Sequence, residues 1–399
     1  MTSLTRRVAL ATTAAVLAAP ATGRAQSREW VIGAPLPITG GLAPDGAKQQ
    51  RGYQFWADTV VAMGGIKVGG QTVMPRLVFA DYQSNTSRAV QAAERLITQD
   101  KCTALFGPLG SGATKATSSV AERYKVPLIA ASASSVEVYD QGYKYLFGTF
   151  TPNATLTTPL VEIVRTQAPD VDSIAILARN DLFPLAIAQE MEKAARVRGI
   201  TVTGFDKYAI GTLDHASALS AMAAAQPKWV FATGYINDLL LIRRQMGELK
   251  VTAPVVTMLA GPAYREFREE LGPLAENVTT ASWWAPAAGY TGCRGPWATT
   301  DAFVRAYEAK LGVVPDYGEA SAVACGVAVQ LAAEAAGTTD PVALRDALAA
   351  LDAPTFFGPL KFGPEGQETA LKPPVLQIQG GKLVVLYPDE IKQATFRRL

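Results

Sequence analysis

The chain has 399 residues, of which 49% are apolar and 18% are charged. A chain this apolar can bury enough surface to offset the entropy of ordering, so a disordered protein is excluded. No apolar run reaches the roughly 20 residues needed to span a bilayer. The formal net charge is +2 and no block of Lys or Arg stands out, which argues against a nucleic-acid partner. The length allows two or three domains.

The N-terminus has the pattern of an export signal. Arg6 and Arg7 precede an Ala-rich apolar stretch at 8–20, and small residues stand before a cleavage site after Ala25. We therefore predict a signal peptide over 1–25. The arginine pair allows twin-arginine export, although the surrounding pattern matches that signal only in part. The peptide contains three arginines and no acids, so its removal changes the net charge from +2 to −1.

Strands and helices are expected to alternate along the rest of the chain. Short apolar runs have the length of buried strands, and apolar residues at helical spacing indicate the helices between them. The alternation restarts near residue 158, so two successive parallel sheets, each with helices on both faces, are predicted. The expected strands are 30–36, 76–80, 104–107, 127–131, 173–177, 201–208, 229–233 and 254–258, and the expected helices are 47–63, 87–99, 113–124, 158–167, 184–198, 213–225 and 238–249.

The last third of the chain must complete these two units. Segment 301–311 and the helices 318–336 and 341–351 are followed by extended segments at 356–362 and 375–385. The chain is therefore expected to cross between two lobes more than once.

The cysteines and the single histidine restrict the chemistry that the chain can perform. Cys102 and Cys325 lie in apolar segments and are expected to be buried, whereas Cys293 lies in a Gly-rich loop and is expected to be exposed; whether any two of them pair stays open. His215 follows Asp214 at a predicted helix start, where capping and exposure to solvent are more common than catalysis. No CxxC, GxSxG or P-loop motif is found, so we expect no enzymatic activity, no metal site and no cofactor.

Four sequence motifs resemble those of the periplasmic solute-binding proteins of branched-chain amino-acid ABC transporters. Their order and spacing carry the resemblance, which covers essentially the whole mature chain. The motifs are IGAPLPITG at 32–40, FGPLGSGAT at 106–114, VPLI at 126–129 followed by GYKY at 142–145, and FGPLKF at 357–362.

The resemblance implies the fold of a type I periplasmic binding protein, in which two doubly wound α/β lobes joined by three crossovers close around a ligand like a Venus flytrap. Lobe 1 is expected to comprise 26–151 and 284–359, and lobe 2 is expected to comprise 152–283 and 360–399. The crossovers are expected near 150–153, 281–285 and 357–363.

The family also implies where the ligand binds. Its first lobe holds the ligand's carboxylate with hydroxyls and backbone amides, and the matching residues are Ser111, Ser132 and Ser134. Ser111 and Ser134 also precede predicted helical segments, where N-capping alone would explain them. On the second lobe the aromatic positions that close over the ligand match Phe183 and Tyr235, for which ordinary packing is the alternative.

The chain departs from the family at Ala260. Family members that bind α-amino acids use an acid at this position to hold the ligand's ammonium group. A buried ammonium without a counter-charge is costly, so we expect an aromatic or other apolar organic acid as the ligand. Asp45, Asp238 and Glu319 are possible replacements for the missing acid, and any of them would keep an amino acid as the alternative ligand.

Further cleft residues are expected near the second crossover. Trp283 and Trp284 point to opposite sides of an extended segment, so at most one of them lines the cleft. We select Trp284, with packing in the hinge as the alternative, and add Tyr317 as a further wall. Asp45 matches a position where the family often has an aromatic residue, and a solvated loop acid is its alternative role. Glu266 and Glu269 are expected to face water.

The resulting prediction is a non-enzymatic, monomeric periplasmic protein that delivers a small solute to the permease and ATPase subunits of an ABC importer. Binding of a branched-chain or other amino acid or of an amide, and a role as a ligand-sensing receptor subunit, are the alternatives. A repressor is excluded because no helix-turn-helix precedes Trp30.

Overall fold

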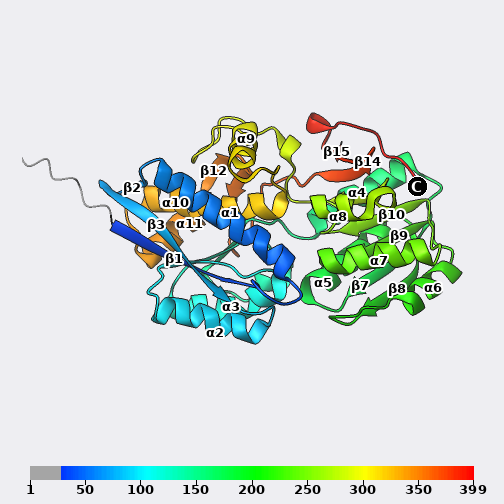
Figure 1. Ribbon diagram of the computed structural model, residues 1–399, viewed down its shortest axis with the longest axis horizontal. Coiled ribbons are helices and arrows are strands. Elements are labelled where there is room, and N and C mark those ends of the chain that lie inside the picture. Colours follow the sequence, from blue (N-terminus) through cyan, green and yellow to red (C-terminus); the bar gives the residue numbers. More distant parts are fainter. Residues whose placement is uncertain (1–27) are drawn as a thin grey trace, which may run out of the picture.

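The computed structural model describes residues 28–399, which form two α/β lobes that lie side by side along the long axis (Figure 1). This architecture confirms the predicted fold class. The predicted signal peptide, 1–25, lies outside the described residues.

Lobe 1 is built around a six-stranded sheet with the order β2-β3-β1-β4-β5-β6. All neighbouring strands are parallel except the β2–β3 hairpin. Helices α2 and α3 cover one face of the sheet, and α1, α10 and α11 cover the other (Figure 1). The bounds are β1 (Arg28–Leu36), α1 (Ala43–Ala62), β2 (Ile66–Val68), β3 (Gln71–Asp81), α2 (Thr86–Thr98), β4 (Ala104–Phe106), α3 (Ser111–Tyr124), β5 (Leu128–Ala130), β6 (Leu146–Gly148), α10 (Tyr317–Ala336) and α11 (Pro341–Ala349).

Helix α10 forms the core of lobe 1. Its N-terminus is a capping box, in which the Asp316 carboxylate accepts from the backbone N–H of Glu319 at 3.4 Å and the Glu319 carboxylate accepts from the N–H of Asp316 at 3.2 Å. The helix is long and apolar enough to cross a membrane, but 83% of its apolar window is buried inside the protein, as expected of a core helix. Helix α1 packs closely against it, because a Cβ at Gly52 would lie 2.4 Å from the Glu319 carbonyl oxygen.

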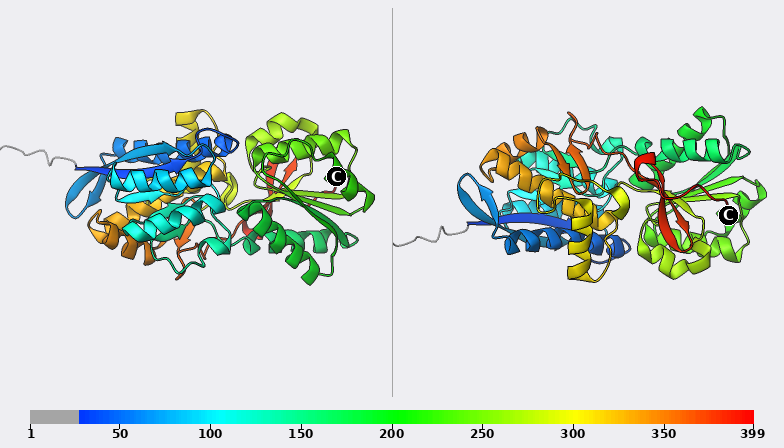
Figure 2. Two further views of the ribbon diagram at one scale, coloured as in Figure 1. Left: turned by 90° about the horizontal axis from the view of Figure 1, so that it is seen from below. Right: turned by 90° about the horizontal axis from the view of Figure 1, so that it is seen from above.

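Lobe 2 contains a seven-stranded sheet with the order β15-β14-β11-β10-β9-β7-β8. Strands β7 to β11 pair in parallel, and β14 and β15 join them antiparallel at one edge of the sheet. Helices lie above and below this sheet (Figure 2). The bounds are α4 (Ala154–Gln167), β7 (Ser173–Arg179), α5 (Leu182–Val197), β8 (Thr201–Tyr208), α6 (Ala216–Ala224), β9 (Trp229–Thr233), α7 (Ile236–Glu248), β10 (Val255–Leu259), α8 (Arg265–Leu271), β11 (Thr279–Ala281), β14 (Val375–Gln379) and β15 (Lys382–Tyr387).

The third crossover lies later in the chain than the sequence motif suggests. Helix α9 (Thr300–Leu311) and the hairpin of β12 (Asp352–Thr355) and β13 (Gly358–Lys361) precede it. The chain then remains with lobe 1, because Gln367 forms a bridge with Gly148 and its side-chain amide donates to the Ser134 carbonyl at 3.0 Å. Lobe 2 begins again where the N–H of Ser282 donates to the Pro374 carbonyl at 3.1 Å. The crossing therefore lies at 372–374, and the prediction of 357–363 is wrong.

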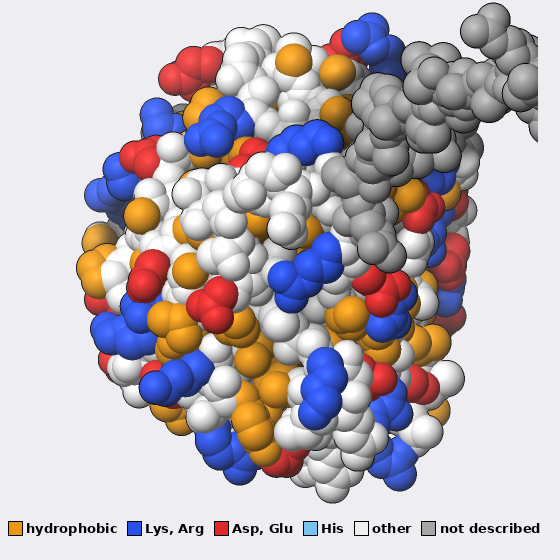
Figure 3. Space-filling view, turned by 90° about the vertical axis from the view of Figure 1, so that its left-hand side faces the viewer, with side chains coloured by type: hydrophobic (Ala, Val, Ile, Leu, Met, Phe, Trp, Pro, Cys, Tyr) orange, Lys and Arg blue, Asp and Glu red, His pale blue; other side chains and the backbone are white. Residues whose placement is uncertain are grey.

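The end face of lobe 1 carries interspersed charges of both signs (Figure 3). On this face single Lys and Arg side chains alternate with Asp and Glu and with small apolar areas. Such a surface does not have the extended basic patch that is typical of nucleic-acid binding.

Candidate functional site

A cavity with an empty volume of about 420 Å³ lies between the two lobes. Its walls are loops that follow the carboxyl ends of strands in both sheets, where ligands bind in open α/β folds, together with residues of the helices α1, α5 and α10. The lobes are in contact around it, since the Asn237 amide donates to the Gly41 carbonyl at 3.4 Å. The lining residues are Asp45, Gln49, Leu109, Ser132, Ser134, Phe150, Phe183, Tyr235, Ala260, Tyr264, Trp283, Tyr317 and Gly318.

Two serine hydroxyls form the polar end of the cavity. The Ser132 Oγ accepts from the N–H of Gly110 at 3.0 Å and from the Gln49 amide at 2.7 Å, so its own hydrogen stays available for a ligand. The Ser134 Oγ is buried and has no hydrogen-bond partner within residues 28–399. Both hydroxyls can therefore donate to an anionic group in the cavity.

Ser111 lies behind this wall instead of lining it. Its Oγ is buried and accepts from the backbone N–H groups of Ser134 and Ser135, both at 3.3 Å. The prediction that Ser111 contacts the ligand does not agree with this placement. The residue holds the Ser134 loop in position, because its hydroxyl accepts from two backbone N–H groups of that loop.

Six aromatic side chains form most of the remaining wall. Phe150 and Trp283 stack with ring centroids 3.9 Å apart, and Tyr264 and Tyr317 stack at 4.9 Å. Phe183 lies 6.2 Å from both Tyr235 and Trp283. The cavity thus offers a mainly aromatic surface to an apolar ligand.

Tyr235 reaches across from lobe 2 to the start of helix α3. Its hydroxyl would lie 2.5 Å from a Cβ at Gly110, whose φ of +82° also requires glycine. A glycine here therefore lets the tyrosine close over the cavity.

Trp284 does not line the cavity, so its selection over Trp283 is wrong. Its indole N–H donates to the Phe356 carbonyl at 3.2 Å, and its ring packs against Phe303 and Phe357 on the lobe 1 side. Trp283 faces the cavity and donates to the Thr151 carbonyl at 3.1 Å. The two rings point apart because successive residues of an extended segment do so.

The three acids considered as replacements at Ala260 differ in what already binds them. The Asp238 carboxylate accepts from the Arg179 guanidinium and from the N–H of Tyr235, both at 2.9 Å. The Glu319 carboxylate is paired with Arg51 at 2.7 Å and does not line the cavity. Both are therefore committed to structural contacts.

Asp45 lines the cavity with one carboxylate oxygen that has no partner among the described residues. The residue is only 2% exposed, and the oxygen without a partner is Oδ2. Burial raises the pKa of Asp45 to about 7, against the opposing effects of the Lys48 charge and of a hydrogen bond from Tyr264. Ala260 also lines the cavity, with a φ of +83°, and its carbonyl accepts from the Tyr317 hydroxyl at 3.0 Å.

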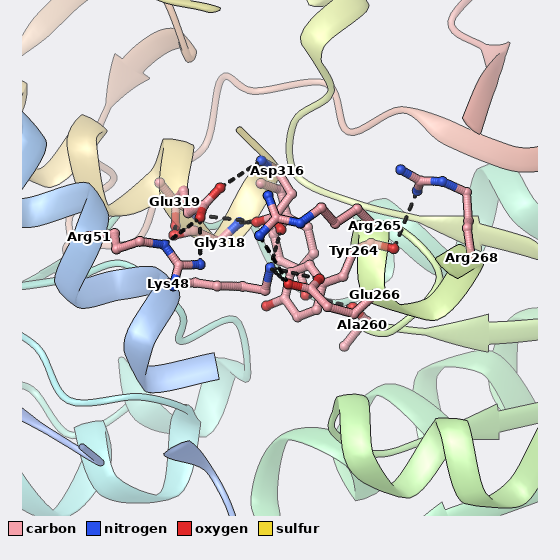
Figure 4. Close-up of polar contacts among 12 residues, drawn as sticks. Lys48, Arg51, Ala260, Tyr264, Arg265, Glu266, Arg268, Asp316, Gly318 and Glu319 are labelled. Atoms are coloured by element: carbon pink, nitrogen blue, oxygen red, sulfur yellow. Dashed lines mark hydrogen bonds and ion pairs between the residues drawn. The ribbon is translucent and has the colours of Figure 1, made fainter. Parts of the chain in front are cut away.

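A buried cluster of charges joins the lobes beside the cavity (Figure 4). The Lys48 ammonium on α1 lies 2.6 Å from Asp316 of lobe 1 and 2.9 Å from Glu266 on α8 of lobe 2. It also lies over the Tyr264 ring, 4.5 Å from the centroid. Burial opposes the charge, but the neighbouring carboxylates of Asp316, Glu319 and Glu266 hold the pKa of Lys48 above its ordinary value. Glu266 was predicted to face water, but in the structure it pairs with Lys48.

The remaining histidine and cysteine predictions concern residues away from the cavity. His215 is buried against the edge of Tyr208, with ring centroids 4.7 Å apart, so the expected exposure to solvent is wrong. Burial lowers the pKa of His215. Cys102 and Cys325 are buried as predicted, Cys293 is partly buried, and none of the three is in a disulfide.

Gln49, Phe150 and Tyr264 line the cavity but were not singled out from the sequence. Phe150 and Tyr264 follow strands β6 and β10, and this position after a strand was a usable signal for both. Gln49 lies within helix α1, where the sequence offers no comparable signal.

Comparison with known proteins agrees with this geometry. Residues 29–382 match the model of a periplasmic binding protein family, so the chain belongs to that family. It is 28% identical over 382 residues to the Leu/Ile/Val-binding protein homolog 8 of Brucella abortus, covering 92% of each chain.

Two solved structures are similar in fold. One is the branched-chain amino acid transporter substrate-binding protein LivJ of Streptococcus pneumoniae in complex with isoleucine, with 24% identity, a TM-score of 0.78, and coverage of 90% of this chain and 100% of that one. The other is an ABC transporter solute-binding protein of R. palustris in complex with benzoate, with 20% identity, a TM-score of 0.76, and coverage of 92% and 99%. The match over residues 29–382 confirms the predicted periplasmic binding protein family, and these two structures share the fold of this chain.

Proposed function

We propose that the chain traps a small aromatic or similarly flat, apolar carboxylate between its lobes and delivers it to the permease and ATPase of an ABC importer. The observation that carries this proposal is the lining of the cavity, which combines two available serine hydroxyls with six aromatic rings. The rings suit a flat apolar body, and the hydroxyls suit an anion.

The lining at Ala260 supports the same ligand class. By the family resemblance, Ala260 stands where amino-acid-binding members hold the ligand's ammonium with an acid, and its methyl group adds apolar surface. A benzoate or phenylpropenoate fits these features better than leucine does.

An amino acid is the second candidate, and Asp45 is the observation that favours it. Its unpartnered carboxylate oxygen lies in the cavity wall, where an ammonium could bind. The fold serves both ligand classes, since one similar structure contains isoleucine and another contains benzoate.

Calorimetry with benzoate-type acids, leucine and phenylalanine tests the proposal. Aromatic acids are expected to bind and to raise the melting temperature, because a ligand at a hundred times its Kd adds about 2.7 kcal/mol to stability. Tight leucine binding without any response to aromatic acids would refute the ligand class. Amides and dicarboxylates complete the panel.

The role in import needs a separate measurement. Cells that lack the gene are expected to lose uptake of labelled benzoate, and the purified protein is expected to be monomeric. Uptake that persists while a benzoate response disappears would favour the role of a sensor subunit instead.

We also propose export to the periplasm with cleavage after Ala25. N-terminal sequencing of the exported protein is expected to start at Gln26. An intact Met1 would contradict this proposal.

A further inference from the structure

Asp45 is the one charged side chain among the described residues that line the cavity. The charges around it are already paired with other groups. Lys48, one helical turn away, is held by Asp316 and Glu266, and the Asp238 carboxylate is held by Arg179. The Asp45 Oδ2 has no partner within residues 28–399.

This arrangement constrains what the cavity can hold. A buried polar oxygen without a partner is costly, and a bound organic anion adds to that cost whenever Asp45 is ionised. No Lys, Arg or His among the described residues lines the cavity to compensate. A ligand with a hydrogen-bond donor at this point would satisfy the free oxygen and lower the cost.

We propose that Asp45 is the specificity-determining residue of the cleft and accepts a hydrogen bond from an O–H or N–H group on the ligand, away from the ligand carboxylate held at Ser132 and Ser134. This inference rests on the proposed function and names the ligand group that is selected at Asp45, which is a hydrogen-bond donor. Donor-bearing ligands thus bind more tightly than matched ligands without a donor.

Asp45 and Ser132 line the cavity from different elements. Asp45 lies on α1, and Gln49, one turn later on the same helix, binds the Ser132 hydroxyl after β5 at 2.7 Å. A hydroxybenzoate carries its carboxylate and its hydroxyl at different positions of one ring, so a single ligand can offer a group to each element.

The test is calorimetry of the full mature protein with benzoate, 3-hydroxybenzoate, 4-hydroxybenzoate and phenylalanine. In the unmodified protein at least one hydroxybenzoate is expected to bind about ten- to a hundredfold more tightly than benzoate, as for a hydrogen bond to a charged group. Asp45→Ala is expected to abolish this ratio. Because benzoate is measured in the same variant, any general effect of the smaller side chain cancels.

The variant Asp45→Asn distinguishes a ligand that donates from a hydroxyl group from one that donates from an ammonium group. Asn keeps an acceptor oxygen but no charge, so a hydroxyl ligand is expected to retain part of its advantage while an ammonium ligand loses it. The isosteric variant also keeps the test valid if Asp45→Ala folds poorly. Ser134→Ala is the matched control, expected to weaken benzoate and hydroxybenzoate equally and leave their ratio unchanged.

Two results would overturn the inference, and they are distinguishable. If benzoate binds as tightly as every donor-bearing probe and neither Asp45 variant changes the ratios, Asp45 is not a specificity determinant although the proposed ligand class stands. If none of the four probes binds, the proposed function fails and this inference fails with it.

Discussion

The two lobes contribute different surfaces to the same cavity. Lobe 1 supplies the polar groups of Asp45, Gln49, Ser132 and Ser134 together with the apolar surface of Leu109, Phe150 and Tyr317, and hydrogen bonds within the lobe already hold the serine loop in place. Lobe 2 supplies Phe183, Tyr235, Tyr264 and Ala260, which offer mainly apolar surface. The difference indicates that lobe 1 is a preorganised anchor and lobe 2 is a lid.

The anchor and the lid are joined by few polar contacts. Lys48 pairs with Glu266 across the cleft, Asn237 donates to Gly41, and the Tyr317 hydroxyl donates to the Ala260 carbonyl. Ligand is thus expected to supply much of the free energy that keeps the lobes closed, and changes on the two sides of the cavity should have different consequences.

The largest effect is expected for Lys48→Met. The change leaves the carboxylates of Asp316 and Glu266 without their cation, and removing one partner of a buried ion pair costs about 3–5 kcal/mol. Urea unfolding should show this loss in the free energy of unfolding. Stability equal to that of the unmodified protein would mean that the cluster is not important for the fold of the anchor.

The next largest effect is a dependence of stability on pH that involves Asp45. Its pKa rises from 3.8 to about 7 on folding, so the folded protein binds this proton more tightly than the unfolded chain. The free energy of unfolding should therefore fall as pH rises from about 4 to about 7, by up to about 4 kcal/mol from this group. Burial is the main cause; Lys48 and Tyr264 act against it, and Asp316 and Asp238 add to it.

Asp45→Asn is the control for that pH dependence, because it removes the titrating group and keeps the shape. Urea unfolding at pH 5 and pH 8 should show a smaller difference for the variant than for the unmodified protein. Parallel pH profiles of the unfolding free energy for the variant and the unmodified protein would show that Asp45 does not cause the pH dependence.

Ser134→Ala should weaken an aromatic carboxylate by about ten- to a hundredfold, since hydrogen bonds to a charged group contribute about 1.5–3 kcal/mol. Ser111→Ala provides the comparison within the anchor. Its hydroxyl holds two backbone N–H groups, so we expect it to lower the melting temperature as well as the affinity. Calorimetry and thermal unfolding on both variants distinguish a ligand contact from a positioning residue.

The smallest effect is expected for Glu266→Gln, which removes the cross-cleft pair and leaves Lys48 paired with Asp316. Affinity for benzoate should fall only severalfold.

Solution scattering with saturating benzoate should show a smaller radius than without it, because the lobes rotate about the crossovers and close. The Glu266→Gln variant should need more ligand to close. An unchanged profile at proven saturation would indicate a rigid cavity instead of a lid.

Much of this organisation could be predicted from the amino-acid sequence. The alternation of strands and helices, the two-lobe fold and the family follow from patterns between residues that are near one another in the chain. Most cavity residues were also predicted from the family resemblance, and several of them stand in loops after parallel strands, which meet at one edge of a sheet. Ser132, Ser134, Phe183, Tyr235, Ala260, Asp45 and Tyr317 all line the cavity.

Only the tertiary structure decided which of these groups are free to meet a ligand. Asp238 is engaged by Arg179, 59 residues away, and Glu319 by Arg51, 268 residues away, which leaves Asp45 as the acid with an oxygen that has no partner within residues 28–399. The same holds for the choice of Trp283 over Trp284 and for the third crossover, which depends on the bridge between Gly148 and Gln367. The physical reason is that a side chain's availability depends on its partners in space, and local sequence patterns do not identify partners that are distant in the chain.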